Sequence, residues 1–194
     1  MSPPLEPRKT TVSIPLPEDA DLPPAVRQRL AQLPPLNNLR MFTAVPQCFL
    51  PVTDLIDALF NHGTVDAKLR QYMYLRIAIK YGLFYEYRHN ILFCRQIGMT
   101  EAEIEALKSD GPVDGLDQIG NLVCAAAEEI TANLSIGDET LKSLMAHFDR
   151  AQTCEIIMLV SWFNMLIRYV ESTRVPYEDD PAAIIAGGAP LKIE

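Results

Sequence analysis

The chain has 194 residues, of which 48% are hydrophobic, 22% are charged and 8% are aromatic, and its formal net charge at pH 7 is −8. This length and composition predict one globular domain with a substantial hydrophobic core. Lysine and arginine form no clustered patch, and acidic residues are in excess. This charge pattern argues against nucleic acid and against an anionic membrane surface as partners.

The first segment, residues 1–23, holds six of the fifteen prolines. Because proline lacks a backbone N–H, this density excludes a regular helix. We therefore expect an extended or disordered arm, which either wraps a neighbouring subunit or stays disordered. The arm lacks the continuous apolar stretch of a secretory signal peptide. The longest apolar run, Ile156–Phe163, is interrupted by Ser161 and is too short to cross a bilayer, so we expect a cytoplasmic protein without membrane partners.

Beyond the arm, the spacing of apolar residues predicts helix nearly throughout, and no segment shows the alternation of a strand. Thr100 followed by Glu103 predicts a capping box at one helix start. The predicted helices cover residues 23–33, 40–61 (one or two helices), 66–82, 84–97, 100–107, 117–133, 138–148 and 153–173. The sequence therefore predicts an all-α fold, with the helical domain in residues 24–175 and an irregular tail in residues 176–194.

The cysteines and histidines do not form a metal-binding pattern. Cysteines stand at positions 48, 94, 124 and 154, and no two of them make a Cys-x-x-Cys pair. The chain has only 3 histidines, so zinc-ligand spacing is missing and we expect no metal or other cofactor. We interpret the cysteines as reduced thiols that mostly fill the core.

The central segment Leu69–Leu107, LRQYMYLRIAIKYGLFYEYRHNILFCRQIGMTEAEIEAL, resembles the core signature of the carboxymuconolactone decarboxylase family, which includes the alkylhydroperoxidase D-like proteins. A later stretch, CEIIMLVSWFNMLIRYVES, is similar to a late helix of that family through Glu155, Asn164 and Arg168. Together the resemblance covers residues 40–172. It implies an alkylhydroperoxidase D-like helical bundle that assembles into trimers or hexamers, with active sites at or near subunit contacts.

The peroxidase branch of this family uses a Cys-x-x-Cys-x-x-x-His motif and an upstream glutamate. Alignment on residues 85–87 places Leu83 and Glu86 at the two cysteines. The same alignment places Asn90 at the histidine and Gln71 at the upstream glutamate. A thiol peroxidase needs a thiolate nucleophile and a resolving thiol. The replacements therefore argue against peroxidase activity of the peroxiredoxin type.

The decarboxylase branch keeps the Tyr-Glu-aromatic sequence and a histidine. Here Glu86 is present, Asn90 replaces the usual histidine, and His89 stands beside it. On a helix, Glu86 and Asn90 share one face, Tyr85 and His89 share a neighbouring face, and Glu86 and His89 are three residues apart. Gln71 comes from the preceding helix and can reach the same site.

The leading hypothesis is a metal-free lyase of the decarboxylase type, acting on a small carboxylated or lactone compound as in the breakdown of aromatic compounds. His89 would be the general acid, because its ordinary pKa lies nearest neutral pH. Glu86 would orient it or share its proton, and Gln71, Tyr85 and Asn90 would bind the substrate.

The alternative hypothesis is a catalytically degenerate family member that acts as an oligomeric binding or structural protein. The enzyme hypothesis predicts that Tyr85, Glu86 and His89 face a closed site, whereas the alternative predicts that they face bulk water or an ion pair. The basic residues of this region form either a solvated face or a cationic lining for an acidic substrate; they are Arg70, Arg76, Lys80 and Arg88.

Overall fold

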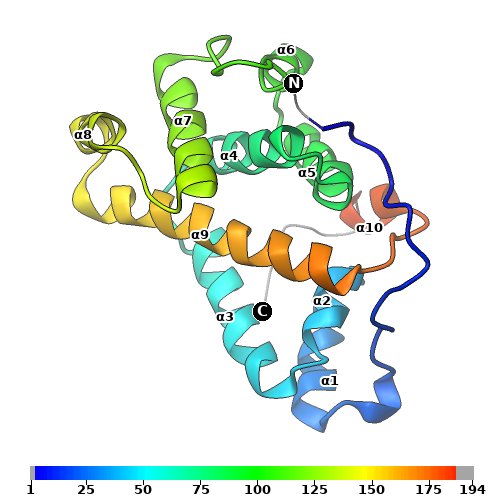
Figure 1. The fold of residues 1–194 in the computed structure, drawn as a ribbon. Coiled ribbons are helices and arrows are strands. Elements are labelled where there is room, and N and C mark those ends of the chain that lie inside the picture. Colours follow the sequence, from blue (N-terminus) through cyan, green and yellow to red (C-terminus); the bar gives the residue numbers. More distant parts are fainter. Residues whose placement is uncertain (1–2, 187–194) are drawn as a thin grey trace. The chain divides into compact units, whose positions relative to one another are not determined.

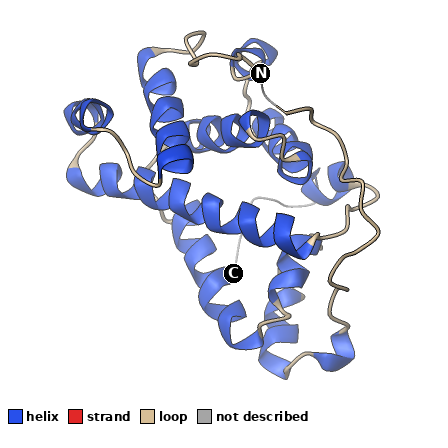
Figure 2. Ribbon diagram, viewed as in Figure 1, coloured by secondary structure: helices blue, strands red, loops and turns tan. Residues whose placement is uncertain are grey.

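The computed structural model describes residues 3–186, and these residues form helices joined by loops, with no strand among them (Figure 1, Figure 2). The predicted all-α fold is confirmed. The elements are a short 3-10 helix η1 (Asp19–Asp21) and the α-helices α1 (Pro24–Leu30), α2 (Asn37–Phe42), α3 (Pro46–Asn61), α4 (Ala67–Lys80), α5 (Phe84–Gln96), α6 (Glu101–Ala106), α7 (Gln118–Asn133), α8 (Asp138–His147), α9 (Arg150–Thr173) and α10 (Pro181–Ala186).

The described residues form two compact units. Unit 1 consists of residues 3–8 and 64–168, and so contains α4 to α8 and most of α9. Unit 2 consists of residues 9–63 and 169–186, and so contains η1, α1 to α3, the last turn of α9, and α10. The internal structure of each unit is described separately below.

Helix α4 is the centre of unit 1, with α5 and α7 packed against it (Figure 1). Every residue from Arg70 to Ile79 is buried, as in a helix that is covered by protein around its whole circumference. Tyr74 of α4 stacks on Phe163 of α9 with 4.2 Å between ring centroids, and its hydroxyl donates to the carbonyl oxygen of Leu159 at 3.2 Å. Helix α9 thereby completes the core around α4.

The end of α4 depends on Gly82. This residue has φ +64°, a conformation that L side chains rarely adopt. A Cβ atom at this position would lie 2.8 Å from the Cβ of Pro3. Glycine is therefore required both by the backbone turn that leads into α5 and by the close passage of Pro3 and Pro4.

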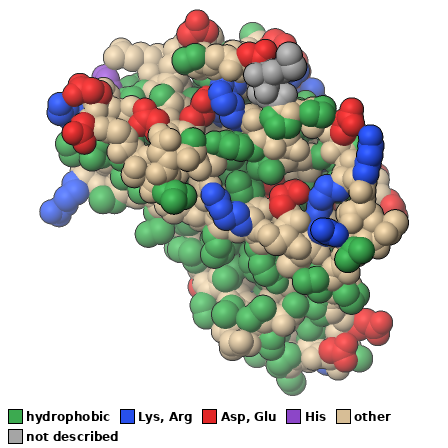
Figure 3. Space-filling model, viewed as in Figure 1, with side chains coloured by type: hydrophobic (Ala, Val, Ile, Leu, Met, Phe, Trp, Pro, Cys, Tyr) green, Lys and Arg blue, Asp and Glu red, His purple; other side chains and the backbone are tan. Residues whose placement is uncertain are grey.

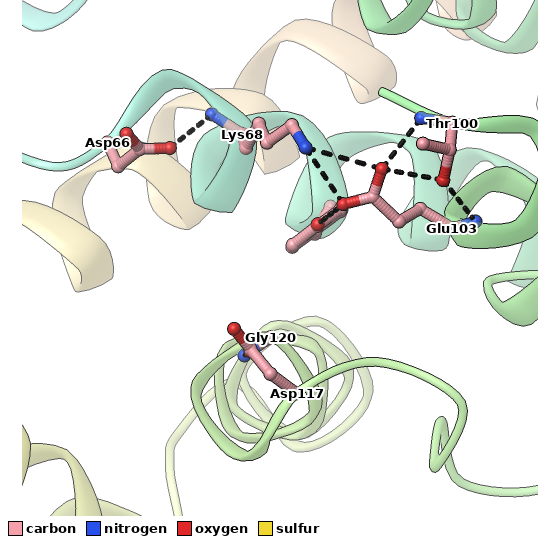
Figure 4. Close-up of polar contacts among 7 residues, drawn as sticks. Asp66, Lys68, Thr100, Glu103, Asp117 and Gly120 are labelled. Atoms are coloured by element: carbon pink, nitrogen blue, oxygen red, sulfur yellow. Dashed lines mark hydrogen bonds and ion pairs between the residues drawn. The ribbon is translucent and has the colours of Figure 1, made fainter. Parts of the chain in front are cut away.

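The predicted capping box at the start of α6 is confirmed: the Thr100 hydroxyl accepts from the Glu103 backbone N–H, and the Glu103 carboxylate accepts from the Thr100 backbone N–H. The same carboxylate accepts from Lys68 Nζ at 2.9 Å and from the Tyr72 hydroxyl, both on α4 (Figure 4). One glutamate thus caps α6 and fastens it to α4. Asp117 caps α7 in turn, accepting from the backbone N–H of Gly120.

Arg76 of α4 is fully buried and binds the loop between α6 and α7. Its guanidinium donates to the carbonyl oxygens of Leu107 and Ser109 at 2.7 and 2.6 Å. It also donates to the carbonyl oxygen of Gly111 at 2.6 Å and to Glu128 of α7 at 2.6 Å. The sequence had left open whether the basic residues of this region form a solvated face. The interpretation as a solvated face is wrong for Arg76 and for Arg70, since both side chains are buried.

Unit 2 is built from α1, α2 and α3, with α1 and α2 both packed against α3. The last turn of α9 joins it through Tyr169, whose ring stacks on Phe42 at 4.7 Å between centroids and whose hydroxyl donates to the carbonyl oxygen of Met41. Part of the arm belongs to this unit. Its Ile14 N–H donates to the carbonyl oxygen of Thr173 at 3.0 Å, and η1 is the one helical turn in the arm's described residues.

The predicted irregular tail is wrong for residues 181–186, which form α10. Pro181 stands at the first helical position, where its missing N–H is no loss, and Asp180 caps the helix by accepting from the Ala183 backbone N–H at 3.0 Å. Before α10, the buried Glu178 accepts from the backbone N–H of Asn37 at 2.7 Å. The rest of the predicted tail, residues 187–194, lies outside the described residues.

Within the part of the chain that the structure describes, α9 is the one helix long and apolar enough, by length and composition, to cross a membrane. The sequence analysis considered the apolar run 156–163 alone. The helix has 24 residues, and 44% of its most apolar 18-residue segment is buried. Its packing against Tyr74 of α4 gives another reason for this apolar character, because a helix at the centre of a protein core has the same composition.

We expect Arg76→Met to lower the free energy of unfolding by about 3–5 kcal/mol, because it removes the donor that three carbonyl oxygens share, while Glu128 keeps its ion pair with Lys80. Arg95→Met is the matched control, since Arg95 makes an exposed ion pair with Glu101 that contributes about 0–1 kcal/mol. Urea denaturation followed by circular dichroism measures both. Equal losses in the two variants would contradict the role assigned to Arg76.

The second prediction concerns acid stability. Burial raises the pKa of Glu103, but the hydrogen bonds from Tyr72, Thr100 and Lys68 outweigh this effect and lower the pKa to about 2. A pKa that is lower in the folded state stabilises the fold above the ordinary value of 4.5, and this contribution disappears as the pH falls toward 2. We expect the difference in Tm between the wild type and Glu103→Gln to shrink over this range. Glu105→Gln is the control, because it alters an exposed ion pair with Lys108. The difference in Tm between this variant and the wild type should be small over the same pH range.

Candidate active site

All of the predicted site residues lie in unit 1 on two adjacent helices. Gln71 belongs to α4, and the other four belong to α5. Every one of them is at most 5% exposed, so none faces bulk water, which was one of the two placements that the non-catalytic hypothesis predicted, the other being an ion pair. The predicted residues are Gln71, Tyr85, Glu86, His89 and Asn90, and we call them the α4–α5 cluster.

Helix α5 is oriented with its polar face inward. The buried positions 85, 86, 89, 90 and 94 follow helical spacing on one side, whereas the hydrophobic Ile91, Leu92 and Phe93 are partly exposed. Burial of apolar residues alone would favour the opposite orientation. A buried polar face is costly unless its groups find partners, and the contacts within the cluster show how several of these groups are satisfied.

Two side-chain amides connect α4 to the Glu86 carboxylate. Gln71 Nε2 donates to Asn90 Oδ1 at 3.2 Å. Asn90 Nδ2 in turn donates to the Glu86 carbonyl oxygen at 2.8 Å and to Glu86 Oε2 at 3.4 Å. The structure therefore brings together the three replaced positions that sequence alignment assigned to the upstream glutamate, the histidine and the second cysteine.

His89 is held by its own helix. Its Nδ1 lies 2.7 Å from the Tyr85 carbonyl oxygen, and because a carbonyl oxygen only accepts hydrogen bonds, Nδ1 carries the hydrogen. Nε2 is then the nitrogen that gains or loses a proton as the imidazole titrates. The Tyr85 ring lies against the imidazole, with 4.5 Å between ring centroids, and restricts its orientation.

Two further buried groups of α4 are Tyr74, which the sequence analysis did not name among the site residues, and Arg70, which it named only as part of a possible cationic lining. Arg70 precedes Gln71 on α4 and is 5% exposed; burial lowers the pKa of its guanidinium, while the charges of Tyr74, Asp66 and Glu155 raise it. Burial raises the pKa of Tyr74, the charge of Arg70 lowers it, and that of Glu86 raises it. Tyr74 thus interacts electrostatically with Arg70 on one side and with Glu86 of the cluster on the other.

The cysteines divide into two buried and two exposed thiols. Burial raises the pKa of Cys94 and that of Cys124 to about 12, although the Gln71 amide, 3.9 Å from the Cys94 sulfur, acts in the opposite direction on Cys94. A thiol of this pKa is protonated at neutral pH and is a poor nucleophile. The prediction that the cysteines mostly fill the core is correct for these two and wrong for Cys48 and Cys154, which are exposed.

Two solved structures resemble this chain. One is the crystal structure of an uncharacterized peroxidase-related protein with an alkylhydroperoxidase AhpD core from Ralstonia eutropha JMP134, with a TM-score of 0.73 and 16% identity over 89% of this chain and 96% of that one. The other is an uncharacterized peroxidase-related protein from Silicibacter sp. TM1040, with a TM-score of 0.73 and 17% identity over 91% of this chain and 96% of that one. No protein-family model and no curated protein matches the chain.

The chain has the alkylhydroperoxidase AhpD-like fold. This confirms the predicted type of helical bundle and supports the resemblance at the level of the fold. At these identities the likeness does not extend to catalytic residues, so the activity must be argued from the α4–α5 cluster. Among the described residues there is no group of three or more histidine, cysteine, aspartate and glutamate side chains that could hold a metal ion.

We expect alkylation of the native protein at pH 8 to modify Cys48 well before Cys94 and Cys124, because Cys48 is exposed and the other two thiols are buried with raised pKa values. Peptide mass spectrometry after timed treatment with iodoacetamide measures the order, and denatured protein should lose it. Rapid modification of Cys94 in the native protein would contradict its burial and restore a thiol-based mechanism as a possibility.

Proposed function

We propose that the α4–α5 cluster is the active site of a metal-free lyase, which decarboxylates a small carboxylated or lactone compound by acid–base chemistry. One observation carries this proposal: a carboxylate, an imidazole, a phenol and two amides are buried together on two adjacent helices. Clusters of buried titratable groups are typical of active sites.

In such a reaction the bond between the substrate carboxylate and its neighbouring carbon breaks, and its electron pair moves into an adjacent carbonyl to form an enolate as CO2 leaves. A proton must then reach that carbon. His89 is suited to this step as the general acid, since Nδ1 is occupied by Tyr85 and the protonated Nε2 can deliver the proton. Arg70 supplies positive charge that favours binding of the substrate carboxylate and stabilises the enolate.

The hydrogen bonds suggest roles for the amides that differ from the predicted one. Gln71 Nε2 already donates to Asn90 and to the Cys94 sulfur, and Asn90 Nδ2 donates to the Glu86 carbonyl and carboxylate oxygens. Each amide nitrogen has two hydrogens, and both are in use. We therefore assign Gln71 and Asn90 as positioning residues for Glu86 rather than as donors to the substrate.

The second candidate function is a non-catalytic oligomeric binding or structural protein. It is favoured by the same amides, because Gln71 and Asn90 cannot titrate, whereas the glutamate and the histidine that the resemblance implies at these positions can. The names of the structural neighbours add a third activity, that of a peroxidase. The burial and high pKa of Cys94 and Cys124 argue against a thiol peroxidase mechanism through either of them.

The experiment is a screen of thermal stability and turnover with small acids and lactones from aromatic breakdown, on the wild type, His89→Asn and Glu86→Gln. A ligand at 100 times its Kd adds about 2.7 kcal/mol, which raises Tm by several degrees in a chain of this size. For a compound that is turned over, we expect each variant to lose about 100-fold or more in kcat. His89→Asn retains a donor for the Tyr85 carbonyl but does not titrate.

His62→Gln is the control, because His62 is exposed and its ion pair is with Asp57, outside the α4–α5 cluster. We expect the activity of this variant to equal that of the wild type. A ligand that stabilises the wild type and both variants equally, without turnover in any of them, would favour the binding protein. Turnover that survives in His89→Asn would contradict the role of His89 as the general acid.

We also propose that the chain assembles into a homotrimer or homohexamer. The outer face of α9 supports self-association, since Met158 and Met165 are 51% and 44% exposed and lie on one side with Cys154 and Ser161. Hydrophobic side chains are visible among scattered charges on the face shown in Figure 3.

Light scattering should give a mass three or six times 21.7 kDa. The double variant Met158→Glu with Met165→Glu should lower that mass. Met145→Glu on α8, which is also exposed, is the control and should leave the mass unchanged.

A further inference from the structure

Unit 2 contains a cavity of about 390 Å³ that has no part in the proposed activity. Its walls come from η1, α1, the turn after α1 and the start of α2; α1 and α2 are labelled in Figure 1. The volume falls within the range of about 300–1,000 Å³ that is typical of small-molecule sites. None of the residues of the α4–α5 cluster lines it.

Two arginines line this cavity, although the chain as a whole carries a net charge of −8. Arg27 of α1 donates through Nη2 to the carbonyl oxygen of Leu22 at 3.1 Å. Arg40 of α2 donates through Nη1 to the carbonyl oxygen of Pro17 at 3.1 Å and to Asp19 at 2.7 Å. Because a guanidinium has five N–H donors, these contacts position both groups and leave further donors for an anion.

The rest of the lining is mainly apolar. Leu33 and Leu36 are buried walls of the cavity, and Leu30 is partly exposed. A ligand that fits both parts has one anionic group and an apolar body. The planar fork of arginine matches carboxylate and phosphate groups in geometry as well as in charge. Arg40 already binds the carboxylate of Asp19 here, so we take a carboxylate as the anionic group of the ligand.

Asp19 already demonstrates the carboxylate contact. It lines the cavity and pairs with Arg40, while its side chain remains 64% exposed. An exposed ion pair of this kind contributes little to stability, about 0–1 kcal/mol, so another carboxylate can replace Asp19 at low cost. The Asp19 carboxylate is then a competitor of the ligand, and its removal should strengthen binding.

We propose that this cavity binds a small organic carboxylate with an apolar body, whose carboxylate is held by Arg27 and Arg40 in place of Asp19 and whose apolar part lies against Leu33 and Leu36. The site is separate from the α4–α5 cluster, so the proposal stands whether or not the chain is a lyase. It adds a second binding site, in a different unit of the chain.

The experiment is an NMR titration of the full chain with hexanoate and, as a neutral probe of similar size, hexanol. We expect hexanoate to shift backbone amides of residues 33–40 and hexanol to do so far more weakly. Arg27→Gln should weaken hexanoate binding about tenfold or more, because a charge-assisted hydrogen bond is lost. Asp19→Asn should strengthen binding severalfold, an effect that general damage to the fold would not produce.

Arg29→Gln is the matched control. It removes the same charge from the same helix, but Arg29 binds Asp54 and Thr53 of α3 and does not line the cavity. We expect its hexanoate affinity to stay within about twofold of the wild type, since the lost ion pair is an exposed one. Equal weakening by Arg27→Gln and Arg29→Gln would mean a general charge effect and would overturn the proposal.

Three other results would also overturn it. Equal shifts with hexanoate and hexanol would mean apolar partitioning only, and the absence of any shift at residues 33–40 would mean that no site is present there. Shifts confined to the amides around Glu86 and His89 would assign the ligand to the α4–α5 cluster instead. Persistence of the shifts in Glu86→Gln would separate the two sites and support the proposal, whatever the activity of that variant.

Discussion

The core of unit 1 depends on the hydrogen bonds and the ion pair of the buried Arg76 guanidinium. This guanidinium is fully buried, and it replaces its lost hydration with three backbone carbonyl oxygens of the α6–α7 loop and with the carboxylate of Glu128. A buried charge is tolerated only when nearly all of its donors are satisfied. Arg76 therefore determines where the loop and α7 lie against α4, the same helix that contributes Gln71 and Arg70 to the candidate site.

The candidate site uses the same physical device on a smaller scale. Polar groups are removed from water on α4 and α5, and amides then hold them in a defined geometry. Gln71 and Asn90 fix the Glu86 carboxylate, and the Tyr85 carbonyl fixes the tautomer of His89. This pre-organisation suits a group that must transfer a proton at one atom, and it is the reason for proposing acid–base chemistry at this site.

The fold itself is shared with peroxidase-related proteins, and the α4–α5 cluster of this chain holds a carboxylate, an imidazole, a phenol and two amides. A fold does not specify an activity, because chemistry depends on the side chains placed at a site. In this chain α4 and α5 present these groups inward, and the side chains at such positions determine which bonds a site can break.

The helices and the Thr100 capping box could be predicted from the sequence, because helical spacing and capping patterns act within a few residues. The sequence also identified the residues of the α4–α5 cluster, although through resemblance to a family rather than through hydrophobic pattern. The burial of Arg70 and Arg76 and the hydrogen bond between Gln71 and Asn90 could be seen only in the folded structure. Such contacts join segments far apart in the chain, so no local periodicity encodes them, and burial of a charge depends on partners that folding alone brings together.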